Sequence, residues 1–155
     1  MLKNKFISFV LFFFITFSAS FVGRQVTISS KEPWYSQLIK SNYNPPDWIF
    51  APIWLTLYLM MTIAIWLFWH SKKRDMNTIY IYFIHIVINT TWSIVFFGLH
   101  QIFLALVALI VLIFLIIILI QRFKRVNLLS YYLMIPYLLW TIYALFLNFN
   151  LMVLN

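Results

Sequence analysis

Long apolar segments alternate with short polar ones along almost the whole chain. Five apolar stretches can be distinguished, at about residues 6–22, 48–69, 79–99, 102–120 and 128–147. A helix of about 20 residues, rising about 1.5 Å per residue, crosses the ~30 Å hydrocarbon core of a bilayer. Lipid leaves no partner for the backbone groups of an open strand, so helices are favoured. The pattern predicts an all-α membrane protein, a single domain over residues 1–155 built as a bundle of five transmembrane helices.

The first apolar stretch has features of a cleavable signal peptide. Lys3 and Lys5 precede it, and Ser18-Ala19-Ser20 near its end is a run of small residues. The apolar run nevertheless continues through Val22, which makes it long enough to anchor the chain. We therefore expect a retained helix.

The basic residues predict an orientation in the membrane. Eight of them fall in three segments that five antiparallel spans would place on one side, namely Lys3, Lys5, Lys72, Lys73, Arg74, Arg122, Lys124 and Arg125. The opposite side holds Arg24, Lys31 and Lys40, which Glu32 and Asp47 partly offset. The positive-inside rule puts the N-terminus in the cytoplasm and the C-terminus outside.

One connection is long, from about Gly23 to Asp47, and it is rich in polar and aromatic residues before it ends at Pro45-Pro46. A long loop on a compact protein is usually functional, so we expect a lid over a site. The remaining connections are short, which makes consecutive helices antiparallel.

Composition agrees with the membrane assignment and excludes several functions. Hydrophobic residues make up 65% and charged residues 9% of the chain, against about 25% charged in soluble domains. The absence of cysteine excludes disulfides and thiolate chemistry. With 2 glycines there is no phosphate-binding glycine loop. We interpret the net charge of +8 as a topology signal and expect no nucleic-acid partner.

Three of the five stretches carry a polar and aromatic face at helical spacing. The faces are Trp54, Tyr58 and Met61; His85, Asn89, Trp92, Ser93 and Phe96; and Tyr137, Trp140, Thr141, Ala144 and Asn148. Polar groups at membrane depth normally point into the bundle, so the three faces predict a cavity with aromatic walls and an amide floor. The stretch at 102–120 is almost wholly aliphatic and predicts a wall that faces lipid.

Simpler explanations exist for several of these residues. Asn89 and Asn148 can serve as interhelical hydrogen-bonding groups alone, and Trp48 near a span end is typical of an interfacial belt. His85 suits a packing role better than a proton relay. Pro136 lies inside its stretch and predicts a bend beside Trp140.

The order of motifs resembles the TspO/MBR family of translocator proteins and tryptophan-rich sensory proteins. The resemblance rests on Trp34-Tyr35-x-x-Leu38-x-Lys40, on Pro45-Pro46-x-Trp48-x-Phe50-x-Pro52-x-Trp54-x-x-Leu57-Tyr58, on Asn89-x-x-Trp92-Ser93-x-x-Phe96-Phe97-Gly98-Leu99, and on Pro136-Tyr137-x-x-Trp140 with Ala144 and Leu147-Asn148. These motifs cover the chain from about Trp34 to its end.

The resemblance implies a five-helix fold that binds tetrapyrroles such as protoporphyrin IX or haem as ligands, with no cofactor required. By matching position it implies a ligand site made of Trp34, Trp54, Tyr58, Asn89, Trp92, Trp140 and Ala144. We expect the porphyrin carboxylates near the loop, where Arg24, Lys31 and Lys40 are available. It further implies a flat hydrophobic ligand and the lipid bilayer as partners, allows a homodimer, and favours the bacterial cytoplasmic membrane as location.

Some positions depart from the family pattern. Ser41 and Ala51 stand where Pro and Gly are usual, and His85 stands where Gln is usual. No basic residue follows Tyr143, so the C-terminal cholesterol-recognition pattern is missing, which argues against a sterol ligand.

Three functions fit these features. The first is a sensor or regulator that binds a tetrapyrrole. The second is light-dependent porphyrin breakdown with Trp34 and Trp140 as redox-active neighbours, since no acid–base pair, nucleophile or metal cluster is evident and no catalytic residue is assigned. The third is transport of porphyrins or other small hydrophobic molecules, for which His85 is the one candidate for a proton-carrying group within the spans.

Overall fold

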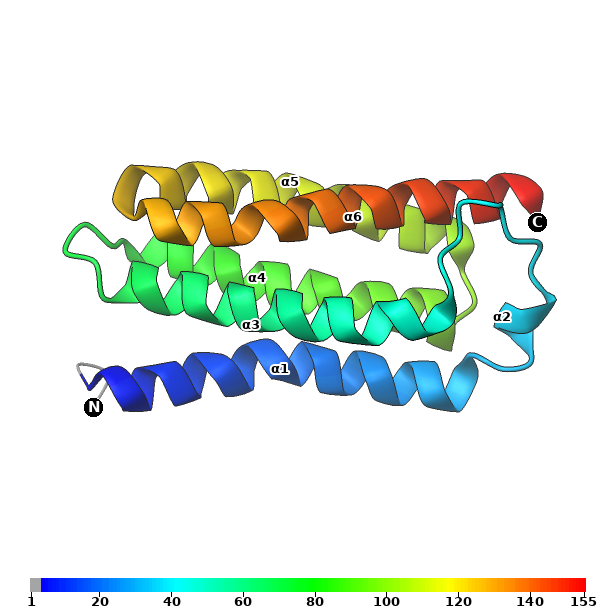
Figure 1. Cartoon of the computed structure of the whole chain (residues 1–155), viewed down its shortest axis with the longest axis horizontal. Helices are drawn as coiled ribbons and strands as arrows, with labels where there is room; N and C mark the ends of the chain where they lie inside the picture. Colours follow the sequence, from blue (N-terminus) through cyan, green and yellow to red (C-terminus); the bar gives the residue numbers. More distant parts are fainter. Residues whose placement is uncertain (1–3) are drawn as a thin grey trace.

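The structure, a computed structural model, describes residues 4–155 and consists of helices joined by short connections (Figure 1). Five helices are long and apolar enough to cross a membrane. They are α1 (Lys5–Ser30), α3 (Phe50–Trp69), α4 (Met76–Ser93), α5 (Ile102–Val126) and α6 (Leu128–Leu154). The shorter elements are α2 (Trp34–Gln37), the 3-10 helix η1 (Asp47–Ile49) before α3, and the π-helix η2 (Ile94–Gly98) after α4. The predicted five-helix membrane fold is confirmed, while Lys3, used above for orientation, lies outside the described residues.

Polar side chains define where three of the helices begin. The side-chain oxygen of Asn4 accepts hydrogen bonds from the amides of Phe6 and Ile7, at 2.9 and 3.2 Å. Asp75 and Asn127 cap α4 and α6 in the same way. These oxygens satisfy backbone donors that the first turn of a helix leaves without partners.

Several helices run further than the hydropathy pattern predicts. α1 continues from the predicted end at residue 22 to Ser30, α5 from 120 to Val126, and α6 from 147 to Leu154. Hydropathy indicates which residues contact lipid, whereas a helix ends where a residue disfavours helical backbone. α1 stops three residues before Pro33, which disfavours helical backbone at Glu32. The lid connection is therefore residues 31–46, shorter than the predicted 23–47.

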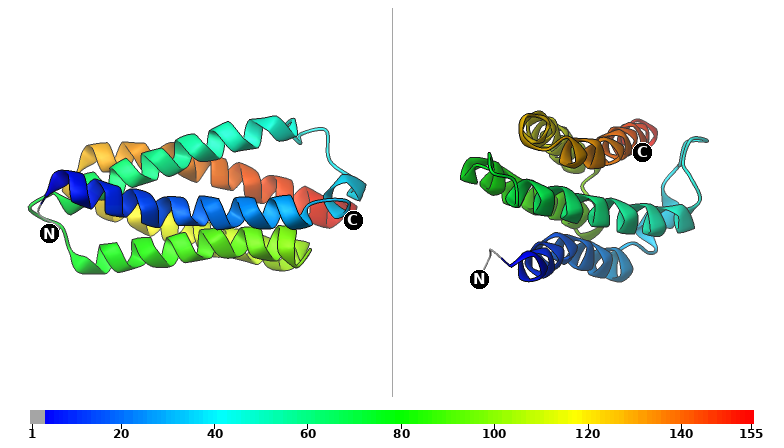
Figure 2. Two further views of the ribbon diagram at one scale, coloured as in Figure 1. Left: turned by 90° about the horizontal axis from the view of Figure 1, so that it is seen from below. Right: turned by 60° about the vertical axis from the view of Figure 1, so that its left-hand side comes forward.

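The long helices form three layers in the view of Figure 1. α3 and α4 make the middle layer, α1 covers one side of it, and α5 with α6 covers the other (Figures 1 and 2). α1 packs on both α3 and α4, α3 also packs on α6, and α5 packs on α4 and α6. The α3–α4 and α5–α6 connections lie at the end of the bundle where the chain begins, and the lid and the C-terminus lie at the opposite end (Figure 1).

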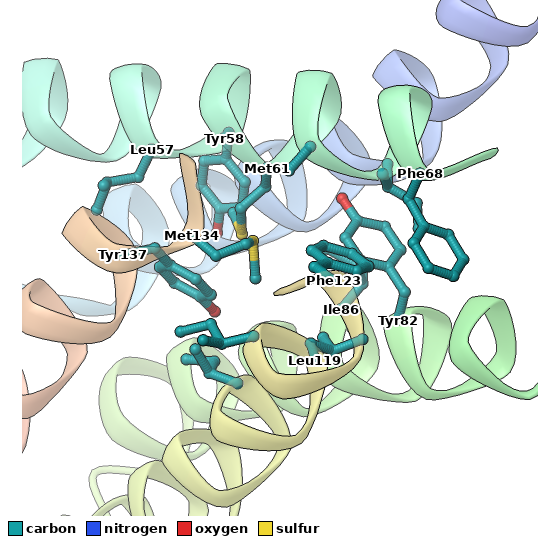
Figure 3. Close-up of a cluster of buried hydrophobic side chains, with 14 of the residues drawn as sticks. Leu57, Tyr58, Met61, Phe68, Tyr82, Ile86, Leu119, Phe123, Met134 and Tyr137 are labelled. Carbon is teal, nitrogen blue, oxygen red and sulfur yellow. The ribbon is translucent and has the colours of Figure 1, made fainter. Parts of the chain in front are cut away.

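The half of the bundle nearest the chain's N-terminus is tightly packed. Phe68 of α3 and Phe123 of α5 are fully buried with ring centroids 5.0 Å apart, and Met61 and Met134 fill the space beside them (Figure 3). The opposite half is less completely filled, because its helices enclose the cavity described below.

The aliphatic helix α5 has two different faces. Leu109, Leu112 and Ile116 are buried against the bundle, while Ile110 and Phe114 are exposed on the outside. The predicted lipid-facing wall therefore describes the outer face of α5, and its inner face is part of the core.

Candidate functional site

A cavity of about 610 Å³ opens in the half of the bundle that carries the lid. It is lined by residues of α1, η1, α3, α4 with η2, α6 and the lid, and α5 contributes no lining residue. Cavities of about 300–1,000 Å³ with mostly apolar walls are typical small-molecule sites. The cavity is therefore the candidate ligand site of this protein.

Aromatic side chains supply eight of the 25 residues that line it. The rings of Trp54 and Trp92 are 6.4 Å apart and inclined by 27°, and Trp92 stacks on Phe96 at 5.5 Å and 17°. On the opposite side the ring of Phe50 meets the ring of Trp140 edge-on at 5.9 Å. These rings make the wall apolar, and the ring surface that they leave uncovered towards the cavity can stack on a flat ligand.

Both amides that sequence analysis singled out line the cavity and also bridge helices. Asn89 accepts a hydrogen bond from the Tyr58 hydroxyl at 2.6 Å and donates to the Tyr137 hydroxyl at 2.9 Å. Asn148 accepts from the Trp92 indole at 3.3 Å and donates to the backbone carbonyl of Ile102 at 2.9 Å. The bridging role and the place in the cavity wall are thus compatible, because each amide has several hydrogen-bonding sites.

His85 lies below the cavity and does not line it. It is fully buried, with Nδ1 at 3.1 Å from the carbonyl oxygen of Tyr82 and Nε2 at 3.1 Å from the hydroxyl of Tyr137. The histidine is therefore hydrogen-bonded on both nitrogens, and through Tyr137 it reaches the amide of Asn89.

The lid is tied to the end of α6. The side chain of Asn155 accepts a hydrogen bond from the amide of Ile39 at 2.9 Å and donates to its carbonyl at 3.1 Å. The hydroxyl of Tyr143 donates to the carbonyl of Tyr43 at 2.6 Å. These bonds hold two separate points of the lid against the same helix.

Within the lid, Tyr35 lies between two lysines. The ammonium groups of Lys31 and Lys40 lie 4.8 and 3.9 Å from the centre of its ring. Burial raises the pKa of Tyr35, and the nearby carboxylates of Asp47 and Glu32 act in the same direction, against a hydrogen bond from Asn44. The Tyr35 hydroxyl therefore remains neutral, and its ring acts as a packing and cation-binding surface.

Six of the seven predicted site residues line the cavity, and Trp34 does not. The six are Trp54, Tyr58, Asn89, Trp92, Trp140 and Ala144. Trp34 instead stacks on His100 at 4.4 Å and 15° and meets Phe96 edge-on at 5.4 Å. It therefore packs the lid onto η2 and onto the connection between η2 and α5.

The cavity wall also contains charged groups of both signs. Lys31 lines it but pairs with Asp47 and lies 4.0 Å from Glu32. Arg24 lines it from α1 with no acidic partner among residues 4–155, and Lys40 is not a lining residue. Of the three predicted cations, Arg24 is thus the one available to an anion in the cavity.

Trp140 contributes a further polar group. Its indole Nε1–H is buried and has no hydrogen-bond partner in the described part of the chain. A buried donor without a partner costs about 1–3 kcal/mol, so such groups are rare and call for an explanation. Because this nitrogen is closed to solvent, an acceptor on a bound ligand could supply the missing partner only after neighbouring side chains move apart.

Comparison with known proteins agrees with the helical membrane architecture. The model of the TspO/MBR family matches residues 9–154. This chain belongs to the TspO/MBR family. Its integral-membrane, five-helix architecture is therefore that of a TspO-type protein.

Relatives within the TspO/MBR family come from bacteria and animals. The tryptophan-rich protein TspO of Chlorobaculum tepidum is 31% identical over 146 residues, which cover 89% of this chain and 89% of the relative. The tryptophan-rich sensory protein of Cereibacter sphaeroides is 31% identical, covering 92% and 90%. The translocator protein of Bos taurus is 31% identical, covering 84% and 79%. The likeness therefore extends over most of each protein.

The sequence reasoning missed the contribution of α1 to the cavity. Ser20, Gly23 and Thr27 line it from one side of that helix. Gly23 permits the close approach, since a Cβ there would lie 2.9 Å from the hydroxyl oxygen of Ser93. The spacing of these small residues at i, i+3 and i+7 is a helical face that could have predicted the contact.

Proposed function

We propose that this TspO-type protein is a membrane-embedded sensor or regulator that binds a tetrapyrrole, protoporphyrin IX or haem, in the cavity beneath the lid. The observation that carries the proposal is the wall of near-parallel rings around Trp92, combined with an indole donor on Trp140 that lacks a partner. A porphyrin is a flat apolar disc with acceptor groups at its rim. Stacking contributes about 0.5–1.5 kcal/mol per aromatic pair beyond the burial of apolar area.

The charges of the wall suit the rim of such a ligand. Its two propionate groups are anionic and need a cation or water, and Arg24 is free to meet one of them. A ligand with its apolar disc between α3, α4 and α6 and its carboxylates towards Arg24 and the lid would satisfy both requirements.

Titration of the purified protein with protoporphyrin IX, followed by tryptophan fluorescence, tests the proposal. We expect saturable binding that Trp140→Ala weakens about tenfold, since the change removes both a stacking face and a donor. Trp48→Ala is the matched control, because Trp48 is 73% exposed and does not line the cavity. Binding that is absent, or that both substitutions affect equally, would refute a tetrapyrrole site in this cavity.

We also propose that the protein lies in a bacterial cytoplasmic membrane with its lid facing outwards. The segments that contain Lys72, Lys73, Arg74, Arg122 and Lys124 lie at the end of the bundle opposite the lid (Figure 1), as expected for a cytoplasmic face. Because the chain has no cysteine, a single Ser41→Cys or Asn77→Cys variant reports the side of each segment. An impermeant maleimide should label Ser41→Cys on intact cells and leave Asn77→Cys unlabelled, and the reverse result would invert the orientation.

A further inference from the structure

A chain of buried hydrogen bonds leads from the cavity wall into the packed half of the bundle. Tyr58 bonds to Asn89 at 2.6 Å, Asn89 to Tyr137 at 2.9 Å, Tyr137 to His85 at 3.1 Å, and His85 to the backbone carbonyl of Tyr82 at 3.1 Å. Tyr58 and Asn89 line the cavity, whereas His85 and Tyr137 are fully buried behind it. Figure 3 shows Tyr58 and Tyr137 reaching inwards from α3 and α6.

The last bond fixes the tautomer of His85. A backbone carbonyl can only accept, so Nδ1 must carry the proton that it donates to Tyr82. Neither hydrogen-bond partner of the fully buried ring is acidic, and an unpaired charge in such a place is costly, so the imidazole is neutral. In a neutral imidazole with a proton on Nδ1, Nε2 is an acceptor.

The direction of every other bond follows from that acceptor. Tyr137 must donate its hydroxyl proton to Nε2 of His85, so its oxygen is left to accept from the amide nitrogen of Asn89. The amide oxygen of Asn89 then points to Tyr58 and accepts the proton of its hydroxyl. The Tyr58 hydroxyl has therefore already used its only donor, and what it can offer a ligand is the lone pairs of its oxygen.

We propose that His85 is a positioning residue that sets the hydrogen-bond polarity of the cavity wall, so that Tyr58 acts as an acceptor and the site favours ligands that present a hydrogen-bond donor there. The ligand-selecting part rests on the proposed function, since it needs the cavity to bind a ligand. The polarity of the chain does not, because it is a property of the protein alone.

An acceptor at position 85 is essential to this arrangement. Without one, the buried Tyr137 hydroxyl would find its nearest acceptor in the amide oxygen of Asn89, and the amide would turn over to bring that oxygen towards it. The amide nitrogen would then donate to Tyr58, whose own proton would be free to point into the cavity. Removing the acceptor at His85 is thus expected to turn Tyr58 from an acceptor into a donor, although His85 does not touch the ligand.

Nitrogen NMR of the ligand-free protein tests the polarity directly. The chain has 3 histidines, and a His85→Gln variant assigns the signals of His85 in a protein labelled with ¹⁵N-histidine. We expect a protonated Nδ1 and an unprotonated Nε2. A proton on Nε2, in either the other neutral tautomer or the imidazolium, would overturn the proposal, because Tyr137 would then accept from His85 and the chain would run in the opposite direction.

A pair of flat probes tests the consequence for ligands. 2-Naphthol presents a hydroxyl donor, and 2-methoxynaphthalene has the same ring system without one. We expect the protein to bind the naphthol about fivefold more tightly, the size of one net hydrogen bond. Tyr58→Phe should abolish this preference, and Tyr132→Phe, the same change on the exposed outer face of α6, should leave it intact.

Two substitutions at position 85 separate positioning from packing. Glutamine can accept from Tyr137 through its side-chain oxygen, so His85→Gln should keep the preference for naphthol, whereas His85→Leu should lose or reverse it. Three results would overturn the ligand-selecting part of the proposal. They are an equal preference in the Leu and Gln variants, a preference that survives in Tyr58→Phe, and no binding of either probe. Protoporphyrin titration of the unmodified protein tests the proposed function separately, so that the two failures can be told apart.

Discussion

The role of Arg24 can be tested by removing a charge from either the protein or the ligand. Arg24 lines the cavity without an acidic partner in the described part of the chain, whereas Lys31 is paired with Asp47. Arg24→Gln should therefore weaken binding of protoporphyrin IX, which carries two carboxylates. It should leave the dimethyl ester of the same porphyrin unaffected, because the ester has the same disc and no charge.

The expected size of the effect follows from the exposure of Arg24. Two opposite charges about 4 Å apart attract by about 1 kcal/mol in water and about 4 kcal/mol in the environment of a protein surface. Arg24 is exposed, and exposed ion pairs contribute at most about 1 kcal/mol. We therefore expect a loss of about fivefold in affinity for the acid, and a smaller loss in high salt, which screens exposed charges.

The assay is tryptophan quenching by the acid and by the ester, each titrated into the unmodified protein and two variants. Arg125→Gln is the matched control, since it removes the same charge from the end of α5, outside the cavity. An equal loss for acid and ester in Arg24→Gln would indicate that the substitution disturbs the wall itself. No loss for either would refute Arg24 as the carboxylate partner, and failure of the unmodified protein to bind would instead refute the proposed function.

Other predictions concern the lid, the helix packing and a helix cap. Asn155→Ala removes both side-chain bonds to the lid backbone, so amide hydrogen exchange at residues 38–43 should become faster. An unchanged exchange rate would show that these bonds do not hold the lid in place. Gly23→Val places a branched side chain where even a Cβ would lie 2.9 Å from the Ser93 hydroxyl, and should lower stability by about 1–3 kcal/mol in thermal unfolding; an unaltered midpoint would mean that α1 and α4 separate at no cost. Asp75→Ala removes the cap of α4 and should cost about 1 kcal/mol. Burial alone would raise the pKa of Asp75, but its bonds to Thr78 and the charge of Arg122 outweigh burial and lower it. Since the folded pKa is the lower one, the stabilisation is present above the ordinary carboxyl pKa and is lost as the pH falls below it. Unfolding at pH 7 and pH 3 should therefore show a smaller pH effect in Asp75→Ala than in the unmodified protein.

Much of the fold could be predicted from the sequence, because the bilayer imposes a simple rule on it. Apolar runs long enough to cross the hydrocarbon must be helices, and the 3.6-residue period then decides which side chains share a face. That reasoning found the five spans and brought Trp54, Tyr58, Asn89, Trp92, Trp140 and Ala144 to one cavity. The residues of a face are fixed by local geometry, so no knowledge of the neighbouring helix is needed to assign them.

The helix ends and the first helix could not be predicted in this way. The drop in hydropathy at residue 22 marks the start of a more polar stretch of sequence, whereas α1 continues through that stretch to Ser30. Its cavity face includes small residues such as Ser20 and Gly23, whose importance depends on how closely α4 approaches. That approach depends on how the helices pack together, which the sequence of one helix does not contain.

Only the tertiary structure decided which of several chemically similar residues are free to act. Lys31 and Arg24 are both cations near the lid, but Lys31 meets Asp47 across 16 positions of the chain and Arg24 meets no acid among residues 4–155. Trp34 is part of a family motif and was predicted to line the site, yet it packs against His100. Trp140 has a buried indole donor without a partner in the described part of the chain. The sequence by itself determined that the protein lies in lipid, which segments form helices, and which residues share one face of a helix, because these properties depend on neighbours along the chain. Pairing, burial and hydrogen-bond direction depend on residues that only the packed bundle brings together.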